Sequence, residues 1–281
     1  MSVGVCVTSP EGIAIATDSR RTVQIGGREG SFSVESDEAQ KLFMLENRIA
    51  VATYGEAMIG ARTVESLMED FKSPISSGAV AVAEAIGTWF AKQLSAATKP
   101  PRGDLVNSKA MRRPVRFVVA GFDEKIGHLY EVKVRAGDSQ VQLLTPNTEN
   151  FGIYPFGQRD GIDRLLTGID RLAMEEARIS VSPEEEDKLR LLSYELVEAE
   201  TLEVAIATAQ SLVEVQLLAQ HISLRAYANR NLRVPGCGGQ IRTIAVARER
   251  ARWEREVIPA RVPSEFLSPV GATPRPQQRS A

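Results

Sequence analysis

The chain has 281 residues, of which 43% are hydrophobic and 25% charged, the composition of an ordinary soluble globular protein. The net charge of −2 gives no general attraction to nucleic acid or to an anionic membrane, and no apolar run approaches the ~20 residues of a membrane span. His128 and His221 are isolated, and Cys6 and Cys237 lie far apart, so we expect neither a metal site nor a cofactor. The first residues lack a basic region before an apolar run, which predicts no secretory signal and a cytoplasmic protein with reduced thiols.

A β-hairpin is predicted at the N-terminus. Val3, Val5 and Val7 alternate with small or polar residues, as in a half-buried strand, and residues 9–12 have turn chemistry. The second strand, 13–18, ends on an aspartate. A turn over 9–12 places residue 2 level with residue 19, whereas a loop of one residue more or less places residue 18 opposite residue 2.

The remaining pattern predicts a glycine- and serine-rich excursion at 24–38 and a mobile, basic loop at 99–114. Further strands are expected at 41–45, 49–54, 115–122, 127–135, 141–144 and 241–247, and helices at 55–71, 79–97, 162–177, from Ser182 onward, 201–227 and 248–256. Hairpins and consecutive helix pairs favour an α+β fold in which two antiparallel sheets pack between helices. We expect one domain over 1–258 and a disordered, proline-rich tail over 259–281.

Ser2 directly follows the initiator methionine, and cells commonly trim methionine before a small residue. Trimming would leave a hydroxyl nucleophile and a free α-amine on one residue. Such an amine ordinarily titrates just above neutral pH, so it can accept the hydroxyl proton. Met-Ser is also a common start, and this pattern alone therefore does not identify a catalytic residue.

Several segments together give the chain a family resemblance. Segment 16–20 reads Ala-Thr-Asp-Ser-Arg, 41–43 reads Lys-Leu-Phe, 49–57 leads from a strand toward a helix, and 230–236 reads Arg-Asn-Leu-Arg-Val-Pro-Gly. In this order, and with Asp18 sixteen positions after Ser2, the chain resembles the proteasome β-subunit superfamily, which includes HslV and the Anbu proteins. The resemblance covers residues 2–250. It implies a four-layer αββα sandwich and an N-terminal Thr or Ser nucleophile.

The resemblance implies roles for individual residues. Ser2 would be the nucleophile, Lys41 a buried cation beside it, and Asp18 the partner that holds Lys41 charged and oriented. A buried lysine is costly without a carboxylate, and a cation stabilises a forming alkoxide, which supports these roles independently. The backbone N–H of Ala52 or Gly55 is the candidate donor to the oxyanion.

Supporting positions depart from the family pattern. Ser19 and Asn231 are the candidate supporting residues, with Asn229 an alternative to Asn231. Gln158 or Arg159 stands where the family has a second serine.

The resemblance also implies function and partners. It implies hydrolysis of peptide amide bonds in peptides or unfolded proteins, a homo-oligomeric ring or helical array, and an ATP-dependent unfoldase as candidate partner. The alternatives are a non-catalytic structural subunit of the same fold and an amidase or transpeptidase with the same nucleophile.

Simpler interpretations exist for the same residues. Asp18 could be a turn residue, Lys41 a charge that protects a sheet edge, and Cys237 a plain loop thiol.

Overall fold

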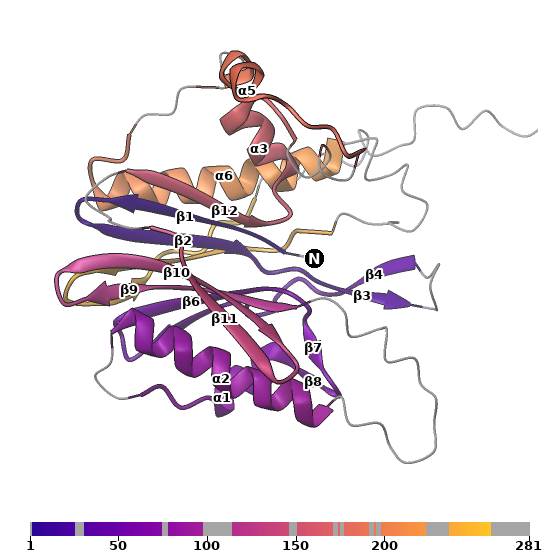
Figure 1. The fold of residues 1–281 in the computed structure, drawn as a ribbon, viewed down its shortest axis with the longest axis vertical. Coiled ribbons are helices and arrows are strands. Elements are labelled where there is room, and N and C mark those ends of the chain that lie inside the picture. Colours follow the sequence, from indigo (N-terminus) through magenta and orange to yellow (C-terminus); the bar gives the residue numbers. More distant parts are fainter. Residues whose placement is uncertain are drawn as a thin grey trace, which may run out of the picture.

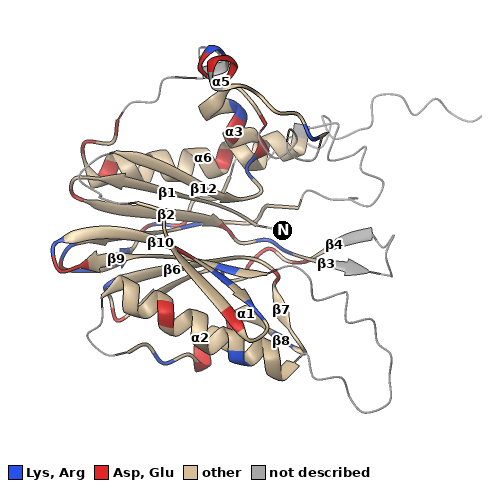
Figure 2. Cartoon of the chain, viewed as in Figure 1, with Lys and Arg blue, Asp and Glu red and all other residues tan. Residues whose placement is uncertain are grey.

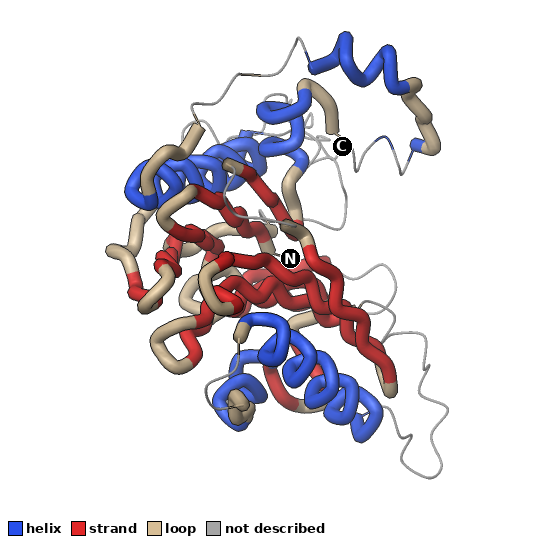
Figure 3. The backbone as a smooth tube through the Cα atoms, turned by 60° about the vertical axis from the view of Figure 1, so that its left-hand side comes forward, coloured by secondary structure: helices blue, strands red, loops and turns tan. Residues whose placement is uncertain are grey.

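The computed structural model describes residues 2–25, 31–74, 78–97, 114–145, 151–170, 174, 177–190, 194, 198–222 and 236–259. Two five-stranded antiparallel sheets lie face to face at its centre, and helices lie on their outer sides (Figures 1 and 3).

The first sheet contains the N-terminal hairpin and has the strand order β12-β1-β2-β13-β14. Its strands are β1 (Val3–Ser9), β2 (Gly12–Asp18), β12 (Gly152–Gly157), β13 (Ile241–Ala247) and β14 (Ala251–Trp253). Because β1 and β2 are central, each has a neighbour on both sides, and all fourteen of their residues are buried.

The second sheet has the strand order β11-β10-β9-β6-β5. Its strands are β5 (Leu42–Leu45), β6 (Ile49–Gly55), β9 (Val115–Asp123), β10 (Ile126–Arg135) and β11 (Asp138–Leu143). Two small hairpins stand outside both sheets: β3 (Arg21–Ile25) with β4 (Ser31–Ser36), and β7 (Met58–Ile59) with β8 (Arg62–Thr63).

Helices lie outside both sheets. They are α1 (Val64–Asp70), α2 (Ala79–Ala97), α3 (Asp160–Thr167), α5 (Pro183–Arg190) and α6 (Leu202–Ile222). Helix α2 packs on β9, β10 and β11, whereas α6 packs on β1, β2 and β13 and contacts α3 (Figure 1). The expected α+β class with antiparallel sheets is therefore confirmed.

Three clusters of buried side chains form the core. One lies between α6 and the first sheet, one between α2 and the second sheet, and one between the two sheets. The residues of β1 belong to two of these clusters, because Val5 faces α6 and Cys6 faces the second sheet. The expected half-buried strand is thus wrong: small residues alternate with valine because both faces are packed. A Cβ atom on Gly4 would lie 2.1 Å from the Phe156 ring.

Two of the predicted helices differ from the structure, and the capping of a third agrees with it. The helix expected over 55–71 begins at Val64, after the β7–β8 hairpin, with the Thr63 side chain capping its N-terminus. The helix expected over 162–177 is α3, which ends where Gly168 adopts a left-handed conformation. The expected capping of α5 is confirmed, since Ser182 and Glu185 bond each other's backbone N–H groups.

Three strand segments also differ. Segment 248–256 contains β14 instead of a helix, and 152–157 forms the unexpected β12. The excursion at 24–38 includes parts of β3 and β4, whose hairpin projects from the body of the molecule (Figure 1). Most of the basic loop, the last residues of the helix expected over 201–227, and residues 260–281 of the tail lie outside the described residues.

Charged residues lie mainly on helices, in loops and at strand ends (Figure 2). Strands β1 and β12 carry none, and β2 carries only Asp18. One described segment, Leu202–His221, is long and apolar enough to cross a membrane by length and composition alone. In this structure it lies along the first sheet as α6.

Candidate active site

The β1–β2 hairpin places Asp18 beside the N-terminal segment. Ser9 pairs with Gly12 and Gly4 with Thr17, which is the first of the two registers considered from the sequence. In this register Asp18 is level with Val3, whose N–H donates a hydrogen bond to Asp18 Oδ1 at 3.0 Å. Strand β13 lies on the other side of Asp18, with Ile241 as its partner.

The Asp18 carboxylate is buried and accepts four hydrogen bonds. Lys41 Nζ lies 2.8 Å from Oδ1, which also binds the Val3 N–H. Oδ2 accepts the N–H of Gly238 at 3.0 Å and that of Arg20 at 3.3 Å. A charged carboxylate is costly to bury unless it is paired and hydrogen-bonded, and these contacts meet that condition. Asp18 is therefore more than a turn residue.

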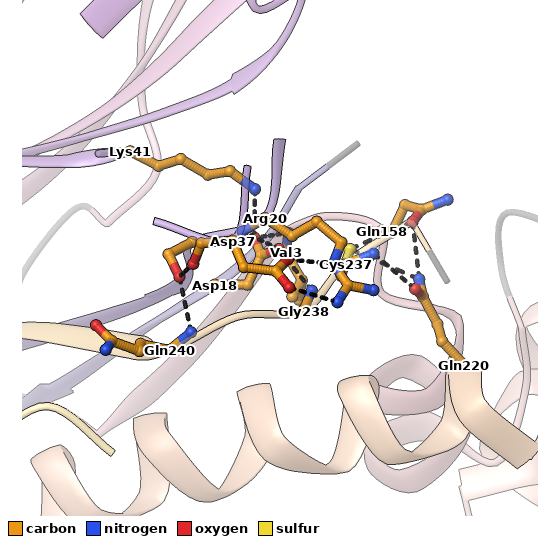
Figure 4. A network of polar contacts seen from close by, with 11 residues as sticks. Val3, Asp18, Arg20, Asp37, Lys41, Gln158, Gln220, Cys237, Gly238 and Gln240 are labelled. Atoms are coloured by element: carbon orange, nitrogen blue, oxygen red, sulfur yellow. Dashed lines mark hydrogen bonds and ion pairs between the residues drawn. The ribbon is translucent and has the colours of Figure 1, made fainter. Parts of the chain in front are cut away.

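Lys41 directly precedes β5, and its backbone C=O accepts the Thr53 N–H at 2.8 Å. This bond holds Lys41 against β6. Its side chain is only 8% exposed and points to Asp18 (Figure 4). The simpler interpretation of Lys41 as a solvated edge charge is wrong, because the ammonium group forms a buried ion pair.

The peptide bond between Ser2 and Val3 is fixed at both of its polar groups. The Ser2 C=O accepts the Gln158 N–H at 2.7 Å, and the Val3 N–H binds Asp18. Position 157 lies so close to Ser2 that it requires glycine. Its φ is +77°, and an added Cβ atom would lie 2.1 Å from the Ser2 carbonyl oxygen. Ser2 is thus held at a defined position beside the ion pair.

Ser2, Lys41, Thr53 and Gly55 line one small cavity of about 30 Å³. A volume of this order suits a single water molecule. The structure therefore brings the predicted nucleophile, the cation and one predicted oxyanion donor to a common space.

The two oxyanion candidates differ in position. Ala52 is fully buried, pairing with Leu42 on one side and Val118 on the other. Because Thr53 N–H bonds Lys41 on the β5 side, strand alternation directs the Ala52 N–H toward β9 and into the ladder. The same alternation directs the Gly55 N–H to the β5 side, as for Thr53. Gly55 ends β6 with φ +90° and lines the cavity beside Ser2.

Ser19, a predicted supporting residue, joins loops beside the site. It is fully buried; its Oγ donates to the Asp37 carbonyl at 2.5 Å and accepts the Gln240 N–H at 2.7 Å. Its own N–H donates to the Gly238 carbonyl at 3.1 Å. Ser19 therefore holds the loop before β13 in place. Asn229 and Asn231 lie outside the described residues.

Sequence reasoning did not find the contacts made by the loop before β13. Besides Gly238, this loop contributes Cys237, which is completely buried and bonded to Gln158 and Gln220 (Figure 4). Burial, and next the negative charge of Asp18, raise the pKa of the Cys237 thiol. Cys237 is thus a buried thiol of this loop, next to the residue that binds Asp18. The glycines at 236, 238 and 239 were the available signal of a tightly packed loop.

An ion pair between Arg20 and Asp37 lies beside the site, next to Gly238. Arg20 Nε lies 2.6 Å from Asp37 Oδ1, and this hydrogen bond holds the pKa of Asp37 below its usual value. A Cβ on Gly238 would lie 2.5 Å from the Arg20 guanidinium carbon, so a larger residue there would displace the Arg20 side chain. Arg20, Asp37 and Gly238 also line a larger cavity of about 570 Å³ beside α6. Within the described part of the chain, no group of three His, Cys, Asp or Glu residues is arranged to hold a metal ion.

Comparisons with known proteins find weak similarity to solved structures. No family model matches the chain, and no curated protein matches it. Among solved structures, the chain is similar to the Anbu (Gly-1) mutant from Hyphomicrobium sp. strain MC1, with a TM-score of 0.49 and 12% sequence identity. The match covers 95% of this chain and 90% of that chain. A similarity at this level does not assign a function.

Proposed function

We propose that this protein is a proteasome-like N-terminal serine hydrolase, which cleaves peptide amide bonds through Ser2 after removal of Met1. One observation carries the proposal. The buried Asp18 carboxylate binds both Lys41 Nζ and the backbone N–H that directly follows Ser2. A charge pair that is costly to bury is thereby held next to the residue with the candidate nucleophile.

In the proposed reaction, the α-amine of Ser2 accepts the hydroxyl proton as Oγ attacks the substrate carbonyl. The Gly55 N–H stabilises the oxyanion, and the Lys41 ammonium stabilises the forming alkoxide. The amide C–N bond breaks, the leaving amine takes up the proton, and an ester on Ser2 remains. Water then hydrolyses this ester and restores the hydroxyl.

Peptides or unfolded proteins are the proposed substrates, and an ATP-dependent unfoldase is the proposed partner, in a cytoplasmic setting. A non-catalytic subunit of the same fold is the second candidate. The small size of the cavity beside Ser2 favours this candidate, because an acyl group larger than a water molecule needs more space. An amidase or transpeptidase would share the acylation step and differ in the acceptor.

Removal of Met1 separates catalysis from a purely structural role. We expect the intact mass of the native protein to be lower than that of the printed sequence by one methionine residue. Ser2→Leu is the control, since a bulky second residue blocks trimming, and it should retain Met1. Native protein that keeps Met1 completely would have no free α-amine on Ser2 and would favour the structural subunit.

We also propose a homo-oligomer larger than a dimer, whose enclosed space would keep folded proteins away from Ser2. The outer side of α6 supports this. Val204 and Leu218 are 38% and 48% exposed, and both lie on one stripe with Val215, at helical spacing.

Light scattering during size exclusion at micromolar concentration tests the assembly. Wild type should elute well above twice 30.7 kDa. Leu218→Glu should shift the mass toward the monomer, because it places a charge in the apolar contact. Ile126→Glu, at an exposed position on β10, is the matched control and should leave the assembly intact. A wild-type peak at 30.7 kDa would contradict the proposal.

A further inference from the structure

A single buried amide on α6 connects the two segments that hold the candidate site. Gln220 lies near the end of α6 and is 6% exposed. Its Oε1 accepts the Cys237 N–H at 2.9 Å, and its Nε2 donates to Gln158 Oε1 at 2.7 Å (Figure 4). The two partners come from segments that are 79 residues apart in sequence.

Each of these segments reaches the site through a backbone N–H. Gly238, next to Cys237, donates to Asp18 Oδ2 at 3.0 Å. Gln158 donates its own N–H to the Ser2 carbonyl at 2.7 Å. The Gln220 side chain therefore connects the loop that binds the Asp18 carboxylate with the segment that binds the Ser2 carbonyl.

We infer that Gln220 is a positioning residue that fixes Ser2 relative to the Asp18–Lys41 pair. This inference rests on the proposed function. A primary amide suits the role because one planar group supplies both the acceptor for Cys237 and the donor for Gln158. Leucine has a similar size but supplies neither, so the buried Cys237 N–H would lose its acceptor and Gln158 Oε1 would lose one of its donors. The connection is reinforced by the Cys237 thiol, which donates to Gln158 Oε1 at 3.3 Å.

The test uses a fluorescent β-lactone that acylates the Ser2 hydroxyl in the full chain. Gln220→Leu should lower the maximal labelling rate ~10- to 100-fold, because a displacement of about 1 Å costs that much, and leave the half-saturating concentration unchanged. Gln210→Leu is the matched control on the same helix, since Gln210 Nε2 donates to Thr243 Oγ1 at 3.2 Å, away from Ser2. It should label at the wild-type rate. Equal rates for Gln220→Leu and wild type would overturn the inference.

A double variant tests whether the two glutamines act through one contact. Gln158→Leu retains the backbone N–H that binds Ser2 but loses the amide that meets Gln220. The Gln158→Leu/Gln220→Leu double variant should therefore label about as slowly as the slower single variant. Rate losses that simply multiply would overturn the shared role.

Hydrogen exchange separates this inference from the proposed function. Gln220→Leu should speed exchange in peptides covering 2–7 and 236–241, which contain two of the three backbone N–H groups bound to Asp18, and Gln210→Leu should speed it in neither. If wild type is not labelled at all, the proposed function fails and exchange alone decides the role of Gln220. Unchanged exchange in both peptides would overturn the positioning role of Gln220.

Discussion

Ser2→Ala should abolish labelling by a β-lactone and all peptide hydrolysis, while the protein keeps its fold. Alanine is small enough for Met1 to be removed, so the variant loses only the hydroxyl group. In the proposed reaction a new ester forms on Ser2 Oγ as the lactone ring C–O bond breaks, and alanine offers no oxygen for this step. Loss of the nucleophile typically lowers the rate by several orders of magnitude.

Two variants make this result specific. Ser2→Thr keeps a hydroxyl and an α-amine on one residue and should still be labelled. Ser95→Ala removes a hydroxyl that bonds the Ala91 carbonyl within α2, and it should behave as wild type. Mass spectrometry of the labelled protein locates the adduct, and thermal melting checks the fold. Undiminished labelling of Ser2→Ala would contradict the assignment of the nucleophile.

The N-terminal hairpin could be predicted closely because its determinants are local. The turn over 9–12 fixes the register, and the register fixes the level of Asp18. Burial of both faces of β1 could not be predicted in the same way. It depends on Phe156, whose ring packs over Gly4 from a strand far away in the sequence.

Strand β12 was not predicted, and its proline and two glycines are unfavourable residues for the interior of a strand. The strand lies at the edge of its sheet, where a missing N–H is tolerated. The prediction of one helix over 162–177 was wrong for the opposite reason. Its apolar periodicity continues past Gly168, but that glycine adopts a left-handed conformation and ends α3.

The candidate site was predictable where residue chemistry is distinctive. A buried lysine requires a carboxylate, and Asp18 and Lys41 do form a pair at 2.8 Å. Gly238 and Gln220 have no such signature. Glycine contributes only a backbone N–H, and glutamine is common on helix surfaces, so their roles depend on how the loop before β13 packs against α6.

Lys41→Met should stop acylation and destabilise the protein, because it removes the cation but keeps a side chain of similar length. Breaking a buried ion pair by removing one partner costs ~3–5 kcal/mol in the free energy of unfolding. Asp18 would keep its hydrogen bonds from three backbone N–H groups, so we expect a loss at the lower end of that range. Urea denaturation measures the stability, and β-lactone labelling measures the acylation.

Comparison with Asp18→Asn divides the catalytic effect of the pair from its structural effect. Asparagine keeps the shape and one acceptor oxygen but cannot hold the ammonium group by charge. Because the two residues are in contact, the Lys41→Met/Asp18→Asn double variant should lose less stability than the two single variants combined. It should remain inactive, since neither the cation nor its orienting charge is present.

Lys133→Met is the control, because Lys133 pairs with Glu131 at 3.0 Å, is 34% exposed and should matter little to either measurement. If Lys41→Met is labelled as fast as wild type, Lys41 only stabilises the fold, and the cation must be removed from the proposed mechanism.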